Sequence, residues 1–237
     1  MTEDLYVIKN RKSYSGIGEK RKLKLKKSLP KYLKSKRKNL IQYFGEEKTK
    51  IIISEAQEAF SDIINKMPYF KTPMYDSLIA LSGKMAALKK GMKWAGIGTE
   101  EFIKFNIDET QITANKIPKF LRVLGGKIYL SRMMQKYLKR VAGNVSINGW
   151  PTKLITGSNK DDFAMSVETT DCQMINFWES IGEGDIKSYC AFFDFTSAEI
   201  LGIGLKQVSS IESGLCKYCF YKDGDVEWPD PIKKILK

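Results

Sequence analysis

Apolar residues recur at steps of three and four over most of the first 140 residues, which predicts a series of amphipathic helices. The first clear helix covers residues 50–67, and Pro68 stops it. Its apolar positions are Ile52, Ala56, Ala59, Phe60, Ile63, Ile64 and Met67. These positions give the helix one face that must be buried against other elements.

A second helix is predicted between Thr72, which suits an N-cap, and Gly96, which suits a C-terminal stop. Its expected buried stripe consists of Leu78, Leu81, Met85 and Leu88. Thr99 offers another N-cap, and a further helix is expected from Lys119 to Val141. The N-terminal part of the chain therefore reads as a helical scaffold.

The pattern changes after residue 142, where Gly, Asn and Pro cluster in "GNVSINGWP". Beyond this point "KLITG", "FAMSVETT", "LKQVSSIES" and "LCKYCFYK" read as strands, and the last two join at Ser213–Gly214. Between them "CQMINFWESIG" and "DIKSYCAFFDFTSAEILG" read as short helices. The predicted fold class is α+β, with a helical N-terminal half followed by a small, mostly antiparallel sheet with short helices.

Positive charge is concentrated at the N-terminus. The whole chain has a net charge of +13, and residues 1–40 hold 14 Lys/Arg against 3 Asp/Glu. We expect residues 1–28 to form a basic arm that folding does not require, because these residues carry no sustained apolar stripe. Such an arm can meet phosphate backbones or anionic lipid, but it lacks the interleaved aromatic residues that stack on bases, so no specific nucleic-acid partner is expected.

No apolar run in the sequence approaches the length of a membrane span, and the residues at its start do not form a signal peptide. A cytoplasmic location is therefore expected. The chain holds 4 cysteines and no histidine, so we expect reduced thiols or metal ligands rather than a disulfide framework. Any chemistry must proceed without imidazole.

Cys216 and Cys219 have the C-x-x-C spacing found in zinc ribbons and thiol–disulfide centres. If the segment is a strand, however, side chains alternate between its two faces, so Cys216 and Tyr218 share one face and Cys219 lies on the other. Two thiols that point in opposite directions cannot bind one metal ion. We therefore predict that Cys216 belongs to a functional site and that Cys219 only packs.

The other two cysteines occupy positions suited to a shared cleft. Cys172 follows a strand and opens a helix, while Cys190 precedes Asp194 by four residues, a spacing that puts both side chains on one helical face. Cys216 on the last strand can join them. Taken singly, each cysteine is more often an inert buried residue than a functional one.

The order of these features resembles the L-2-amino-thiazoline-4-carboxylic acid hydrolase family. The resemblance is carried by "SVETTDC", "WESIGEGD", "YCAFFD" and "CKYCFYK", and upstream by "LPKYLKSKRKNL", "MYDSLIALSGKMAALKKGMKWAGIGTEEF" and "KYLKRVA". It covers residues 29–222, divided into a helical part at 29–142 and an α+β part at 143–222, with 223–237 left as a C-terminal tail. A fainter likeness links the terminal strand to the 4-vinyl-reductase type of ligand-binding domain.

The resemblance implies a hydrolase that opens a cyclic amidine by adding water. Such a reaction needs a nucleophile, a carboxylate to hold the amidinium and move protons, and a cation for the substrate's carboxylate. Cys190 with Asp194 is the first candidate for this role, and Cys172 at a helix start is the second. The alternative is a metal site in which Cys172, Cys190, Cys216 and Asp194 bind zinc or another divalent ion.

Two further functions remain open from the sequence. One is a non-catalytic sensor module that binds a small molecule or a metal ion in the same cysteine-lined cleft. The other is binding of a nucleic acid or a membrane surface through residues 9–38. Substrate-binding residues and the oligomeric state do not follow from the sequence.

Overall fold

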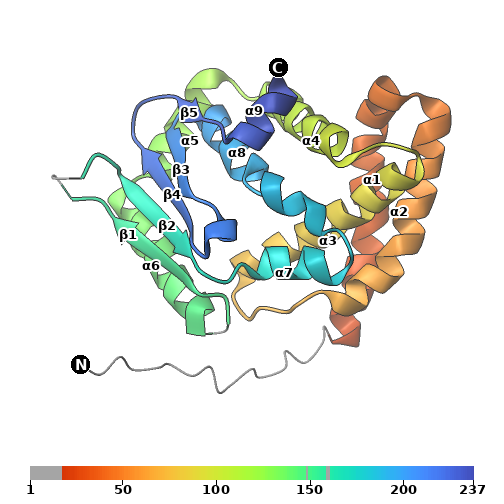
Figure 1. Cartoon of the computed structure of the whole chain (residues 1–237), viewed down its shortest axis with the longest axis horizontal. Helices are drawn as coiled ribbons and strands as arrows, with labels where there is room; N and C mark the ends of the chain where they lie inside the picture. Colours follow the sequence, from red (N-terminus) through yellow and green to blue (C-terminus); the bar gives the residue numbers. More distant parts are fainter. Residues whose placement is uncertain (1–17, 148, 159–160) are drawn as a thin grey trace.

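The protein is described by a computed structural model that covers residues 18–147, 149–158 and 161–237. Six helices come first in the chain (Figure 1). They are α1 (Glu19–Phe44), α2 (Glu46–Lys66), α3 (Pro73–Trp94), α4 (Thr99–Ala114), α5 (Lys119–Tyr129) and α6 (Arg132–Ile147). Figure 1 shows α1 and α2 on one side of the molecule and the sheet on the other, with α3, α7 and α8 between them.

The later elements alternate between strands and short helices. The strands are β1 (Thr152–Thr156), β2 (Met165–Thr169), β3 (Gly204–Ser209), β4 (Cys216–Tyr221) and β5 (Val226–Glu227). The helices are α7 (Gln173–Ser180), α8 (Phe192–Leu201) and α9 (Asp230–Leu236), with 3-10 turns η1 (Gly184–Tyr189) and η2 (Ile211–Ser213). The predicted α+β class, helical first and mostly antiparallel afterwards, is confirmed.

Helix α1 changes the interpretation of the basic N-terminal arm. Residues 19–28 are helical, and Leu25 and Leu29 are buried in line with Leu33 and Leu40. Arg21 also pairs with Asp76 on α3. The premise that residues 1–28 carry no apolar stripe is therefore wrong for the helical part, because leucines at steps of four and seven form a buried stripe within the lysine-rich sequence. The preceding part of the arm lies outside the described residues.

We expect Leu29→Ala to lower the free energy of unfolding by about 2–5 kcal/mol, because the side chain is 3% exposed and its removal leaves a cavity. Leu23→Ala is the matched control, since Leu23 lies on the same helix and is 54% exposed. The control should cost less than about 0.5 kcal/mol. Urea unfolding of both variants measures the difference, and equal effects would show that α1 does not pack as described.

Helix α3 buries a different stripe from the one predicted. Leu88 is buried as expected, but Leu78, Leu81 and Met85 remain partly exposed. The buried positions of this helix are Tyr75, Ile79, Ser82, Gly83, Ala86, Ala87, Leu88, Lys89, Gly91 and Met92. Small residues allow this helix to approach α2 closely, and a Cβ added at Gly91 would lie 2.2 Å from the backbone oxygen of Ile52. Taking the large apolar side chains as the buried ones therefore predicted the wrong face of α3.

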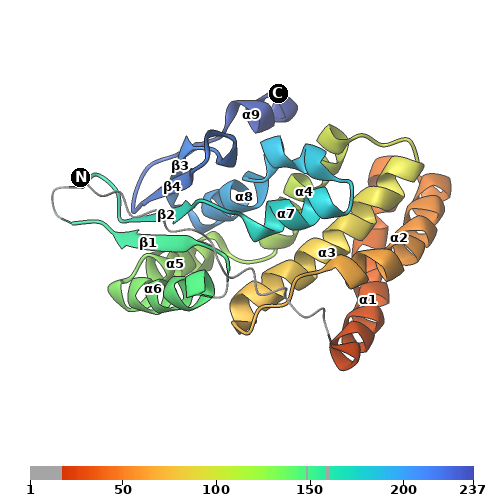
Figure 2. The same ribbon diagram turned by 60° about the horizontal axis from the view of Figure 1, so that its bottom comes forward.

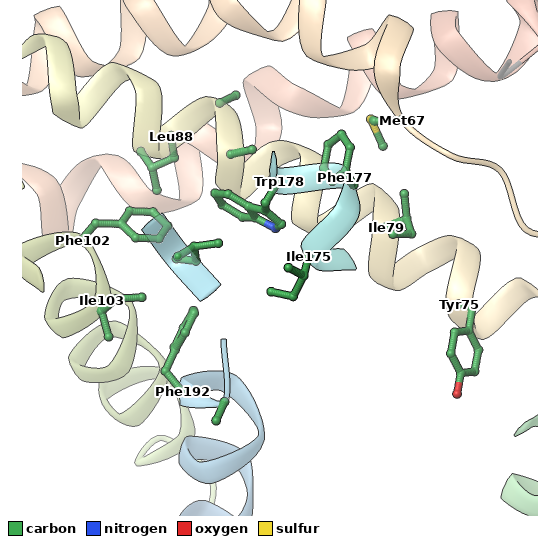
Figure 3. Close-up of a cluster of buried hydrophobic side chains, with 14 of the residues drawn as sticks. Met67, Tyr75, Ile79, Leu88, Phe102, Ile103, Ile175, Phe177, Trp178 and Phe192 are labelled. Carbon is green, nitrogen blue, oxygen red and sulfur yellow. The ribbon is translucent and has the colours of Figure 1, made fainter. Parts of the chain in front are cut away.

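The core links the helical part to the later elements. Figure 3 shows Trp178 and Phe177 of α7 packed among side chains of α3 and α4, including Leu88 and Phe102. The Trp178 indole Nε1 donates a hydrogen bond of 2.6 Å to the Ser82 hydroxyl on α3. Both halves of the chain thus share one hydrophobic core.

The helix expected over 119–141 is two helices. Helix α5 ends at Tyr129 and α6 begins at Arg132. The Gly125–Gly126 pair lies within α5 and not at the break, and a Cβ at Gly126 would be 2.4 Å from the Leu201 carbonyl oxygen on α8. Gly126 therefore permits close contact between two helices and does not interrupt one.

The five strands form one sheet in the order β1-β2-β4-β3-β5. All neighbouring pairs are antiparallel except β3 with β5, which is parallel. One face of the sheet packs against helices, as the ring contacts of Phe220 with Tyr129 on α5 and of Tyr218 with Phe195 on α8 show. The opposite face carries charged side chains, including the Lys217–Glu168 ion pair.

Residues 223–237 are not a tail. They contribute β5, the edge strand of the sheet, and α9, whose Ile232 is fully buried. The segment is short, and its few apolar residues give too weak a periodic pattern to identify either element from the sequence. In the described part of the chain, no helix is long and apolar enough to cross a membrane.

Candidate functional site

Cys172 is the N-cap residue of α7 and lies three residues after the end of β2. The backbone N–H groups of Ile175 and Met174 interact with its thiol, as expected at a helix N-terminus, and they favour the thiolate. Burial outweighs this effect and raises the pKa of Cys172 to about 11. The sequence therefore predicted the position of Cys172 correctly, but the thiol is protonated at neutral pH.

Cys190 and Asp194 lie on a continuous stretch of helical backbone. Cys190 closes η1 with φ −56° and ψ −26°, Ala191 is also in the αR region, and Asp194 belongs to the first turn of α8. Burial raises the pKa of Cys190, and the negative charges of Cys216, Cys172 and Asp194 raise it further. The Cys190 thiol is thus a weak source of thiolate.

Asp194 combines two properties that rarely occur together. Its side chain is exposed to solvent, yet desolvation by the surrounding protein raises its pKa from 3.8 to about 6. The surrounding protein therefore makes ionisation of this carboxyl group less favourable than it is in water. A pKa close to neutrality suits a group that must both accept and return a proton.

Strand β4 presents its two cysteines as predicted. The register pairs Cys216 with Thr169 and Cys219 with Ser166, so the two thiols lie on opposite faces of the sheet. Cys216 shares its face with Tyr218, and the Tyr218 hydroxyl is within hydrogen-bonding reach of the Cys216 and Cys190 thiols. A C-x-x-C pair acting through both sulfurs is therefore excluded by the strand geometry.

The negative charge of Asp194 raises the pKa of six side chains, in addition to the effect of burial. They are Cys172, Cys190, Cys216, Tyr75, Tyr129 and Tyr218. The structure thus brings together every residue predicted for the site. Asp194 and these six side chains come from α3, α5, β4, α8, the N-cap of α7 and the C-cap of η1.

The three tyrosines were missed by the sequence analysis. Tyr218 could have been found, since it lies two residues beyond Cys216 on the same face of a strand. Tyr75 and Tyr129 come from α3 and α5, and no local pattern connects them to the cysteines. Figure 3 shows Tyr75 leaving α3 with its hydroxyl directed away from Ile79 and Met67. Burial raises the pKa of Tyr129 to about 12, so its hydroxyl remains a hydrogen-bond donor.

The described residues around Asp194 show no group of metal ligands. Within the described ranges, no group of three or more Cys, Asp or Glu residues lies close enough together to hold a metal ion. Cys172, Cys190, Cys216 and Asp194 influence one another through their charges, but they do not converge on one point at ligand distance. The zinc alternative gains no support from this geometry.

The site also lacks the expected cation for a substrate carboxylate. Among the residues that the structure describes, no lysine or arginine charge lowers the pKa of Asp194, of the three cysteines or of the three tyrosines. When Asp194 is ionised, the region that it shares with these tyrosines and thiols is therefore negative. This arrangement favours a small cation with N–H donors over an anion.

Comparisons of the chain with family models, with curated proteins and with solved structures find no match.

Proposed function

We propose that the protein is a hydrolase of the L-2-amino-thiazoline-4-carboxylic acid hydrolase type, which opens a cyclic amidine at the site around Asp194. The observation that supports this proposal is the exposed Asp194 carboxyl with its pKa raised to about 6, whose charge influences three tyrosines and three thiols. A carboxylate is the natural partner of an amidinium, since its two oxygens can accept two parallel N–H bonds.

In this proposal Asp194 is the proton carrier and the thiols are not nucleophiles. Asp194 takes a proton from water as the water oxygen attacks the amidine carbon. The bond between that carbon and the ring sulfur then breaks, and the proton passes from Asp194 to the departing sulfur. The added hydroxyl group releases its remaining proton to solvent as its oxygen becomes the carbonyl oxygen of the carbamoyl group. The product is an N-carbamoyl-cysteine. This assignment follows from the raised pKa values of Cys172 and Cys190, which leave little thiolate at neutral pH.

A binding module without turnover is the second candidate. The tyrosine rings and the ionised Asp194 would hold a small planar cation equally well if no water reached the amidine carbon. The absence of a nearby lysine or arginine charge within the described residues favours this candidate for ligands that carry no carboxylate.

The test is incubation of the purified protein with L-2-amino-thiazoline-4-carboxylate, with the released thiol followed by a chromogenic disulfide and the product identified by mass. We expect saturable thiol release, and we expect Cys190→Ser to retain activity within about tenfold of the parent. A loss of more than about a thousandfold in Cys190→Ser would instead assign the nucleophile to the thiol. Saturable binding of this compound without any product would support the second candidate, a binding module without turnover.

A further inference from the structure

Helices α5 and α6 form a strongly basic hairpin. Residues 115–147 contain 8 Lys/Arg and no Asp or Glu, whereas residues 41–114 carry −1 and residues 148–237 carry −5. With residues 1–40 at +11, these values sum to the chain's +13. The positive charge of the chain is thus concentrated in this hairpin and in the lysine-rich N-terminal segment, while residues 41–114 and 148–237 are nearly neutral or acidic.

The same hairpin exposes large apolar side chains. Phe120 is 70% exposed and Met133 is 74% exposed, and Leu121, Leu124, Ile128 and Tyr137 are each at least 45% exposed. A single exposed apolar residue is ordinary, but several of them on two successive helices that lie side by side point to a contact surface.

The exposed residues of α5 lie on one side of the helix. Phe120, Leu121, Leu124 and Ile128 follow steps of one, three and four, and together they form a stripe. The opposite side of α5 is fixed to α8, where Gly126 approaches the Leu201 carbonyl. Figure 2 shows α5 and α6 side by side at the periphery of the molecule, next to β1. The outward face of the hairpin therefore combines apolar and basic side chains.

The basic side chains of the hairpin are not neutralised by the protein. None of the Lys/Arg residues between positions 115 and 147 forms an ion pair with any other residue that the structure describes. By contrast, several lysines of α1 and α3 are paired with carboxylates. The positive charge of the hairpin thus remains available to an anionic partner.

We propose that the α5–α6 face docks on the surface of an anionic lipid bilayer. A helix with lysines and arginines flanking exposed Phe, Leu and Met side chains can lie in the headgroup region and bury its apolar stripe there. The basic residues add attraction to anionic lipid headgroups.

Two other occupants fit this face less well. A second copy of the chain would bring two positive surfaces together, and these would repel each other. A nucleic acid would neutralise the charge, but it would leave the aliphatic stripe in water. The lipid surface satisfies both features. This inference does not depend on the proposed hydrolase function, because it uses no residue of the Asp194 site.

The experiment measures binding of the full-length protein to vesicles by flotation. Vesicles of equal parts phosphatidylglycerol and phosphatidylcholine should bind the protein, and pure phosphatidylcholine vesicles should bind it at least about tenfold more weakly. Phe120→Ser combined with Leu124→Ser should reduce binding to the anionic vesicles about tenfold or more. The exposed positions predict normal folding for this variant, and circular dichroism checks it.

Matched controls come from exposed positions on α1 and α2. Leu23→Ser combined with Ile51→Ser removes apolar residues that are 54% and 47% exposed, and it should leave binding within about twofold. Lys119→Glu with Lys127→Glu should weaken binding at least about tenfold, while the same change at Lys34 and Lys38 of α1 should weaken it far less.

Three outcomes would overturn the proposal. One is an equal loss of vesicle binding in the α1 charge variant, which would assign the attraction to the lysine-rich N-terminal segment. Another is binding to oligonucleotides that requires Lys119 and Lys127, with no binding to anionic vesicles. The third is a dimer in sedimentation that dissociates in the variant with both Phe120→Ser and Leu124→Ser.

Discussion

Asp194→Asn should lower kcat/KM for thiazoline opening by at least about a thousandfold. Asparagine cannot accept a proton from water, and it carries no charge to hold an amidinium, so the variant loses both roles of the carboxylate. The measurement is thiol release under the conditions used for the parent protein.

Glu199→Gln is the matched control for this substitution. Glu199 lies on the same helix α8, is exposed, and accepts a hydrogen bond of 2.8 Å from Gln111. Its activity should stay within about twofold of the parent. If Asp194→Asn retained activity comparable to Glu199→Gln, the carboxylate would have no part in the reaction.

The pH dependence of the parent protein's kcat/KM gives a second test of the role of Asp194. Asp194 acts as a base only when ionised, so kcat/KM should rise through a pKa of about 6 and level off above it. A reaction driven by the Cys172 thiolate would instead keep rising toward the raised pKa of that thiol, about 11. The two profiles differ clearly between pH 7 and pH 9.

Replacing Asp194 by asparagine should raise the stability of the protein although it lowers the activity. Because burial raises the pKa of Asp194 in the folded state, the folded protein holds this proton more tightly than the unfolded chain does. The cost of ionisation appears as the pH rises from about 4 to about 6 and is complete above that range. Asp194→Asn should therefore be more stable than the parent at pH 8, by about 1–2 kcal/mol after allowance for solvent screening, and equally stable at pH 4.

The sequence predicted those parts of the site that depend on local periodicity. Alternation along β4 placed Cys216 and Cys219 on opposite faces, and the four-residue spacing placed Cys190 beside Asp194. Both inferences need only the geometry of one element. Tyr75 and Tyr129 could not be predicted in this way, since they reach the site from helices more than 60 residues away from Asp194 in the chain.

The protonation of the thiols could not be predicted from the sequence either. A helix N-terminus favours a thiolate, and on that ground Cys172 was a candidate nucleophile. Burial is a property of the assembled core, and at Cys172 it exceeds the contribution of the helix. Likewise, the leucines of α1 are spaced regularly, but the surrounding lysines lowered the mean hydropathy of the segment so far that it resembled an unpacked arm.

Lys89 is a buried charged residue of α3 that the sequence did not reveal. Its side chain is 3% exposed, and its ammonium group contacts Glu183 at 2.5 Å and Asp185 at 2.8 Å. Glu183 is itself 2% exposed, and Lys90 and Lys93 lie farther from it, at 3.7 and 3.9 Å. The ion pair ties α3 to the segment between α7 and α8 that carries Cys190.

Lys89→Met should lower the free energy of unfolding by about 3–5 kcal/mol, because it leaves the Glu183 carboxylate buried without its closest partner. Lys93→Met is the control, since Lys93 is 67% exposed and contacts the same carboxylate, and it should cost less than about 1 kcal/mol. Adding Glu183→Leu to Lys89→Met should restore part of the lost stability, because the unpaired charge is then gone. Urea unfolding at pH 7 measures all three variants. If Lys89→Met proved no more destabilising than Lys93→Met, the buried pair would not hold these segments together, and the position of Cys190 beside Asp194 would need another support.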